Sequence, residues 1–270
     1  MSSATSEPAL HFARAVQAVE AELPWEELGA RYCYEGGESF FEPDQVDAIR
    51  EAGLKIAAEV AARLEEVGER RGQGSRTGPQ GASLYAGAAV AELVPALCEC
   101  LVLGRSVRLL NLPGPEPTLL NGALARAEAS LNEALRTDEP LRLPRIETER
   151  SGIERAWFDH LWLTSVLTDP EAFPALHDSL YGLLPTSGAR PFADKEPTRR
   201  GNLPAEEKRA RELLRGLVVR VDPPAVVTTS DEELGLVRAA FEERGLRLSD
   251  PTPARLSAIV GDPLRSYVVS

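Results

Sequence analysis

The sequence predicts an α/β fold built on a mostly parallel sheet, and three neighbouring segments carry that prediction. Residues 83–86 and 107–112 are short apolar runs typical of buried strands, and residues 88–103 form a long helix-favouring apolar run between them. Gly87 and Gly104 separate the three segments, and a Pro-Gly-Pro turn closes the last one. Two short strands joined by a helix of this length form a right-handed βαβ unit, which belongs in a parallel sheet.

The ends of these two strands are the places to look for a ligand. In open parallel sheets, ligands bind outside the carboxyl ends of the strands. Gly87 and Asn111 stand at those ends in this sequence.

The composition is that of an ordinary globular protein. With 270 residues, of which 43% are hydrophobic and 27% charged, the chain can bury one sizeable core. The net charge of -12 argues against a nucleic-acid surface, which needs clustered lysine and arginine. We expect neither a signal peptide nor a membrane span, since Glu92 and Glu99 interrupt the longest apolar stretch. Three cysteines do not make a disulfide framework, so we expect a cytoplasmic protein.

A helical region is expected in front of the sheet. Residues 10–23 carry apolar side chains at helical spacing, and Pro43 with Asp44 opens a longer helix that reaches about residue 71. The aromatic segment 31–41 between them either seals the helices onto the sheet, which we favour, or forms a lid over a ligand cleft. The expected organisation is a helical N-terminal region over 1–72, a linker over 73–81 and an α/β domain over 82–270.

Further apolar runs predict that strands and helices alternate to the end of the chain. The expected strands are 141–148, 157–167, 225–229, 246–248 and 266–269, of which the last two form a hairpin-like pair of edge strands. The expected helices are 128–136 (continuing the helix after the second strand), 168–181, 204–219 and 230–243. Ser230 and Glu233 have the spacing of a capping box.

A long loop at residues 183–203 carries a cluster of basic residues. We favour a solvated loop, and the functional alternative is a clamp for an anionic substrate or partner. The basic residues are Arg190, Lys195, Arg199 and Arg200.

This order of elements over residues 81–270 resembles the class I S-adenosylmethionine-dependent methyltransferase fold. The resemblance implies an acid at the end of the first strand, followed by a GxGxG turn beside the amino-acid end of the cofactor. It also implies an acid after the second strand for the ribose hydroxyls, a polar residue after the third strand for the adenine, and a Phe-Asp pair opening the fourth strand. The pair Phe158-Asp159 matches the last of these features, and Thr164-Ser165 closes that strand.

The cofactor motifs of the family are eroded in this chain. The first acid falls on Tyr85, the three glycines fall on Gly87, Ala89 and Ala91, and the ribose acid falls on Asn111. Alanine adds a methyl group where the backbone must approach closely and disfavours positive φ. The polar residue after the third strand falls near Thr148 or Glu149, and Glu116 either swings back to the ribose or caps the next helix. The cofactor-binding residues that the resemblance implies are Tyr85, Gly87, Ala88, Ala89, Asn111, Leu112, Thr148 and Thr164.

Two functional hypotheses of different classes follow. The first is an S-adenosylmethionine-binding methyltransferase that acts on a small molecule or a protein-borne acceptor. Because catalysis in this fold consists mostly of positioning, no catalytic residue is named. The second is a degenerate, non-catalytic methyltransferase fold that serves as a scaffold or partner-binding subunit, with a protein partner or a second copy of itself. A nicotinamide enzyme ranks third, because the turn at residues 87–92 fails the G-x-G-x-x-G pattern at its second and third glycines.

Other candidate residues favour structural roles. Asp159 is expected to cap backbone groups at a strand start, and His160 and His177 are expected to be satisfied core residues. No G-x-S-x-G elbow accompanies them, so a catalytic triad is not expected. Cys98 and Cys100 would point to different faces of a helix, so no metal site is predicted even with Cys33 added.

Overall fold

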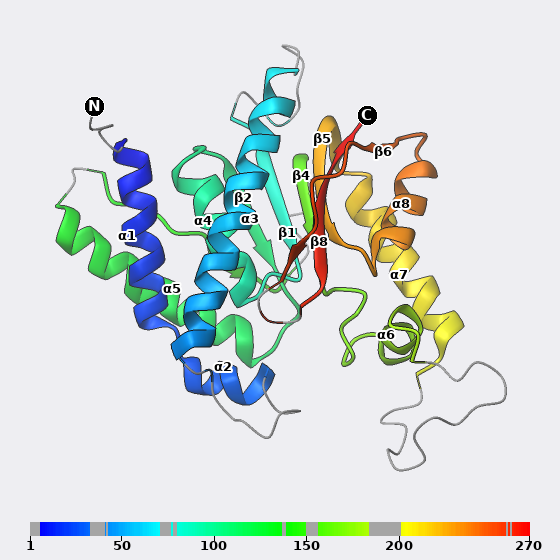
Figure 1. Cartoon of the computed structure of the whole chain (residues 1–270), viewed down its shortest axis with the longest axis horizontal. Helices are drawn as coiled ribbons and strands as arrows, with labels where there is room; N and C mark the ends of the chain where they lie inside the picture. Colours follow the sequence, from blue (N-terminus) through cyan, green and yellow to red (C-terminus); the bar gives the residue numbers. More distant parts are fainter. Residues whose placement is uncertain are drawn as a thin grey trace.

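The computed structural model describes residues 6–32, 41, 43–70, 77, 80–136, 139–149, 156–183, 201–257, 259 and 261–270 (Figure 1). Several predicted features lie outside these residues: most of the linker 73–81, most of the aromatic segment 31–41 with Cys33, and the basic cluster of Arg190, Lys195, Arg199 and Arg200.

The core of the molecule is one mixed sheet with the strand order β3-β2-β1-β4-β5-β8-β6, and β7 pairs with β8. Strands β1 to β5 run parallel, whereas β8 runs antiparallel to β5 and to β6. This is the methyltransferase-like arrangement that the sequence predicts, with a mostly parallel sheet and an antiparallel terminal strand. The strands are β1 (Ala82–Ala86), β2 (Ser106–Leu110), β3 (Ile146–Glu147), β4 (Phe158–Leu163), β5 (Val221–Ser230), β6 (Leu248–Ser249), β7 (Arg255–Leu256) and β8 (Pro263–Val269).

Three strand predictions need correction. Strand β3 is far shorter than 141–148, because the Leu141 and Leu143 amides donate to Asn132 and Glu128 of a helix and Pro144 has no amide to donate. Strand β4 ends at Leu163, since φ is +56° at Ser165. Strand β8 lies between β5 and β6, so it is not an edge strand.

Helices cover both faces of the sheet (Figure 1). Helices α1, α3, α4 and α5 lie on one face of the sheet, and α6, α7 and α8 lie on the other. Each set of helices packs on a separate hydrophobic cluster. The helices are α1 (Glu7–Glu22), α2 (Trp25–Tyr32), α3 (Pro43–Glu69), α4 (Leu93–Leu101), α5 (Pro115–Leu135), α6 (Pro174–Leu180), α7 (Leu203–Val218) and α8 (Leu234–Glu242). Within the described part of the chain, none of these helices has the length and apolar character needed to span a membrane.

The helix predicted over 88–103 begins later than expected. A 3-10 turn, η2 (Val90–Glu92), precedes α4, and residues 87–89 form a separate turn. Pro95 lies in the first turn of α4, where its missing N–H leaves no hydrogen bond unmade. Because the helix begins after residue 89, Gly87, Ala88 and Ala89 form a non-helical turn at the carboxyl end of β1.

A buried polar network joins the middle strands. Its centre is Glu99 of α4, whose carboxylate lies 2.5 Å from the Tyr85 hydroxyl, 3.1 Å from Arg105 Nε and 2.7 Å from His160 Nδ1, and it also accepts from Ser83. Burial alone would raise the pKa of Glu99, but His160, Arg105 and the Ser83 hydroxyl outweigh it and lower that pKa to about 2.

Asp159 belongs to the same network. Its carboxylate lies 2.6 Å from Arg105 Nη2 and accepts from the Ala82 amide at 2.8 Å. His160 contacts Thr228 in the next strand at 3.1 Å. The expectation that Asp159 caps a backbone group is therefore confirmed. His160 is a core residue as expected, although its Nδ1 lies near Glu99 without forming a hydrogen bond.

Replacing Glu99 by alanine is predicted to cost about 3–5 kcal/mol of folding free energy, because it takes one of two carboxylate partners from the buried Arg105 and removes the acceptor of the buried Ser83 and Tyr85 hydroxyls. Urea unfolding at pH 7 measures this change. The matched control is Glu133→Ala on the exposed side of α5, which is expected to shift stability by no more than about 0.5 kcal/mol. Equal, small effects of the two substitutions would contradict the role given to Glu99.

Candidate functional site

The strand order reverses between β1 and β4, and this position is where open α/β sheets bind ligands. The chain continues from β1 toward β2 and β3 on one side, and β4 and β5 lie on the other. Two segments leave the sheet side by side at the carboxyl ends of these strands: the turn 87–92 after β1, and the segment 164–168 after β4. Together they frame the candidate site.

The turn after β1 is fixed to the end of β2 by Asn111. The Ala88 amide donates to the Leu110 carbonyl at 2.9 Å, and Asn111 Nδ2 donates to the Ala88 carbonyl at 2.8 Å. Asn111 Oδ1 in turn accepts from the Leu112 amide at 2.7 Å. Both polar groups of the Asn111 side chain are thus engaged by backbone, and the residue shapes the turn.

Gly87 is required by both backbone conformation and packing. Its φ is +77°, in the region that favours glycine. A Cβ at this position would lie 2.5 Å from Val166 Cγ2 and 3.3 Å from the Thr164 carbonyl oxygen. The side chain of Val166 therefore occupies the space above Gly87, and the segments after β1 and β4 are packed together.

Glu92 joins the same two segments by hydrogen bonds. Its Oε2 accepts from the Ala89 amide and its Oε1 from the Thr164 hydroxyl, each at 3.0 Å. Trp162 Nε1 donates to that hydroxyl at 2.9 Å, so the proton of Thr164 is directed at Glu92. Burial raises the pKa of Glu92 although both bonds oppose the rise, and the charge of Glu116 raises the pKa further. The side chain of Glu92 is therefore a buried acid at the reversal point of the sheet.

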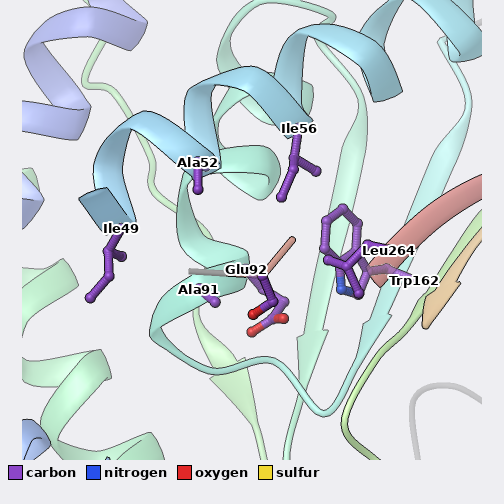
Figure 2. Close-up of a pocket in the computed structure, with 9 residues that line it drawn as sticks. Ile49, Ala52, Ile56, Ala91, Glu92, Trp162 and Leu264 are labelled. Atoms are coloured by element: carbon purple, nitrogen blue, oxygen red, sulfur yellow. The ribbon is translucent and has the colours of Figure 1, made fainter. Parts of the chain in front are cut away.

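A small pocket lies over Glu92 (Figure 2). Figure 2 shows Ile49, Ala52 and Ile56 of α3 on one side of it and Glu92 on the other. The remaining lining residues are Gly53, Ala91, Trp162, Ser257 and Leu264. The cavity volume of about 10 Å³ is close to the minimum that holds one water molecule. Helix α3 thus covers the carboxyl edge directly above the acid.

The structure brings only some of the predicted cofactor residues together. Gly87, Ala88, Ala89, Asn111 and Thr164 surround the reversal point. Leu112 and Thr148 are exposed at the β2 and β3 side of the edge. Tyr85 is fully buried in the core, with its hydroxyl on Glu99 and its ring stacked on Trp162 at 5.0 Å between centroids.

Glu92 was missed as a candidate binding residue by sequence reasoning, whereas Glu116 was considered as a partner of the ribose or a cap of the next helix. The available signal for Glu92 is an acid at the start of a mostly apolar helix. Glu116 is buried in the first turn of α5, although neighbouring Pro113, Gly114 and Pro115 are exposed. Among the described residues, no group of three or more His, Cys, Asp or Glu side chains is placed to hold a metal ion.

Glu233 holds the segment after β4 from the opposite side. It is fully buried, and its Oε1 accepts from the Leu167 and Thr168 amides at 2.5 and 3.3 Å.

The Glu233 amide donates to Ser230 Oγ, as the predicted capping box requires. The other half of that prediction is wrong, because the carboxylate turns to Leu167 and Thr168 instead of the Ser230 amide. Burial raises the pKa of Glu233 to about 8.

Comparison with known proteins finds weak similarity to solved structures. No family model and no curated protein matches the chain. Among solved structures, it is similar to magnesium protoporphyrin IX methyltransferase from Synechocystis PCC 6803 with bound SAM, with 10% identity over 100% of both chains and a TM-score of 0.45. It is also similar to the O-methyltransferase from Bacillus cereus in complex with SAH, with 11% identity over 97% of this chain and 91% of that chain and a TM-score of 0.38. MtNAS in complex with MTA and tNA is 14% identical over 96% of this chain and 69% of that chain, with a TM-score of 0.40. At these values the function has to be argued from the residues of this chain.

Gly87→Ala is predicted to destabilise the fold by about 2–4 kcal/mol, because it adds a clash with Val166 to the cost of about 1–2 kcal/mol for positive φ. Gly104→Ala is the matched control: φ is +63° there, but the nearest atom to the added Cβ is 4.0 Å away. Gly104→Ala therefore measures the backbone cost alone in chemical denaturation. Combining Gly87→Ala with Val166→Ala is expected to remove the clash, and failure of the double variant to recover any stability would contradict this packing.

Glu233 is predicted to make stability fall as pH rises from about 4.5 to about 8. In this window the folded protein keeps a proton on Glu233 that the unfolded chain has lost, so higher pH favours unfolding. Glu233→Gln removes this dependence, and its stability relative to the unaltered protein is expected to rise by about 3–5 kcal/mol across the window. Denaturation curves at a series of pH values measure the difference. A constant difference would show that the carboxyl group is not protonated in the folded protein.

Proposed function

We propose that the carboxyl edge between β1 and β4 binds S-adenosylmethionine, and that the protein transfers a methyl group to a small molecule or a protein-borne acceptor. The observation that carries this proposal is the buried Glu92 carboxylate at the point where the strand order reverses. Its raised pKa reflects burial near a second acid, and perturbed acids at such positions are typical of ligand sites.

The charge of the ligand follows from the acids. Glu92 is 6% exposed, Glu116 is equally buried, and the charge of Glu116 raises the pKa of Glu92. A cation relieves this repulsion and stabilises both ionised carboxylates. S-Adenosylmethionine brings two positive groups, a sulfonium and an ammonium. Glu92 would then replace the acid missing at Tyr85, and Glu116 the acid missing at Asn111.

The residues fit the cofactor in chemistry, whereas the available room requires a movement. Small-molecule sites usually have volumes of about 300–1,000 Å³, far above the pocket over Glu92. The α3 side chains Ile49, Ala52 and Ile56 lie across this pocket, so binding requires α3 to shift away from the edge. When bound, the cofactor supplies an electrophilic methyl group. The chain would hold the cofactor through Glu92, Glu116 and the 87–89 turn, and would position the acceptor.

The closed edge also favours a second candidate, the non-catalytic scaffold. Val166 packs over Gly87, and α3 packs so tightly on α4 that a Cβ at Gly53 would lie 2.9 Å from Val94 Cβ. A sheet edge sealed in this way suits a fold that has lost its ligand and keeps its surface for a partner.

Calorimetric titration with S-adenosylmethionine and S-adenosylhomocysteine tests the proposal. We expect micromolar binding of S-adenosylmethionine, and weaker binding of S-adenosylhomocysteine because it lacks the sulfonium charge. Glu92→Gln is predicted to weaken binding of S-adenosylmethionine about tenfold or more, which corresponds to about 1.4 kcal/mol.

The matched control is Glu206→Gln. Glu206 is likewise buried and accepts from the Ala175 and Leu176 amides at 2.8 and 2.9 Å, but it lies on the opposite face of the sheet. Its substitution should leave the affinity unchanged. Absence of binding to the folded protein at millimolar S-adenosylmethionine would exclude the enzyme and leave the scaffold as the better account.

A further inference from the structure

A second group of acids lies further along the same edge, beyond the segment that follows β4. Glu232 and Glu233 stand at the start of α8, and Asp262 stands immediately before β8. His177 and Tyr181 come from α6 and its C-terminal end. We call these five residues the acidic cluster. Four separate parts of the chain meet there, because Thr168 after β4 contacts both Glu233 and His177.

Two aromatic rings form the more exposed part of the acidic cluster. The Tyr181 hydroxyl donates to Asp262 Oδ2 at 2.7 Å, and His177 Nδ1 lies 2.6 Å from the Thr168 carbonyl oxygen. The two rings lie 4.8 Å apart between centroids. Both side chains are half-buried, whereas Asp262 is 5% exposed and Glu233 is 0% exposed. The two rings are thus more exposed than Asp262 and Glu233.

The acids of the acidic cluster disfavour one another's ionised forms. Burial raises the pKa of Asp262 and Glu232 adds to the rise, while Tyr181 and His177 lower it. The charge of Asp262 likewise adds to the burial that raises the pKa of Glu233. Within the described part of the chain, Glu232 Oε2 and Glu233 Oε2 are buried and accept no hydrogen bond. A cationic hydrogen-bond donor would relieve both the repulsion and the missing bonds.

The chemistry favours an organic ammonium group as that donor. The described residues contain no group of three side chains placed to hold a metal ion. An ammonium group carries three N–H donors on a compact charge, and the faces of aromatic rings attract it. Buried carboxyl oxygens without a hydrogen-bond partner, close to two partly exposed aromatic rings, match these needs. A neutral alcohol would supply a donor but would leave the repulsion in place.

We propose that the acidic cluster binds the protonated primary amine of the acceptor molecule. The amine is a recognition group that stays charged, and the methyl group goes to another atom of the acceptor. The role as an acceptor site rests on the proposed methyltransferase function, since the segment held by Glu233 also carries Thr164, the partner of Glu92. Binding of the amine itself needs no cofactor and can be measured separately.

The test is a titration with butylamine at pH 7, without S-adenosylmethionine, followed by the amide signals of Leu167, Thr168 and Glu233 in nuclear magnetic resonance spectra. We expect saturable shifts with butylamine and none with 1-butanol at the same concentration. Asp262→Asn keeps an acceptor for the Tyr181 hydroxyl but removes a charge, and it is predicted to weaken binding at least tenfold.

The matched control is Asp231→Asn. Asp231 is exposed, adjoins the acidic cluster in sequence and pairs with Arg265 at 2.9 Å. Its substitution therefore removes the same charge from a residue outside the cluster. The affinity of the Asp231→Asn variant for butylamine should stay within about twofold of that of the unaltered protein. If Asp262→Asn does not fold, the partly exposed Glu232→Gln takes its place, with the same expected loss.

Three results would overturn the proposal: no saturable shift, equal shifts with 1-butanol, or equal weakening by Asp231→Asn, which would indicate attraction to the net charge alone. The outcome is independent of the calorimetric test. Amine binding by a protein that does not bind S-adenosylmethionine would exclude the methyltransferase function and support the amine site. Binding of S-adenosylmethionine without binding of butylamine would exclude only the amine site.

Discussion

The buried carboxylate of Glu99 is the interaction on which the rest of the structure depends. It lies on the helix that follows β1 and contacts Tyr85 of β1, Arg105 before β2 and His160 of β4. These contacts fix β1 and β4 against each other, which places the reversal of strand order between them. The polar chain continues from His160 to Thr228 of β5 and, at 2.8 Å, to Ser266 of β8. One carboxylate thus anchors hydrogen bonds that cross four strands.

Three of the buried acids, Glu92, Glu99 and Glu233, differ in what compensates their charge. Glu99 has His160 and Arg105 beside it, and they lower its pKa. Glu233 accepts only from backbone amides, and Glu92 accepts from one backbone amide and one hydroxyl. Burial raises the pKa of both acids. A buried acid without a nearby cation is costly. Both uncompensated acids stand at the carboxyl edge of the sheet, where a ligand would meet them, and the compensated one lies in the core. This contrast is the physical basis for placing the ligand sites.

The sequence predicts the βαβ unit well because local signals define it. Short apolar runs and Gly87 fix β1 and the turn after it, and positive φ at Gly87 agrees with the choice of residue. The prediction fails where distant side chains decide. Strand β3 shrinks because Asn132 and Glu128 take its amides, and β8 enters the sheet through pairing with β5.

The candidate site was less predictable than the fold. The resemblance directs attention to Tyr85 at the end of β1, but the alternation of side chains along the strand turns that residue into the core. Glu92 gains its role from Thr164, 72 residues later in the chain. Such a partner leaves no mark in the local pattern around residue 92. The loss of two glycines and two acids therefore says little by itself, since acids from neighbouring positions stand at the same edge.

The central claim is that the edge between β1 and β4 is a cofactor site covered by α3. Hydrogen exchange with and without S-adenosylmethionine tests it most directly. The account predicts slower exchange at the amides of residues 88–89 and 166–168, together with altered exchange in α3 at residues 49–56, where the helix must move. Unchanged exchange in all three segments at millimolar S-adenosylmethionine, in a protein that is otherwise folded, would contradict it.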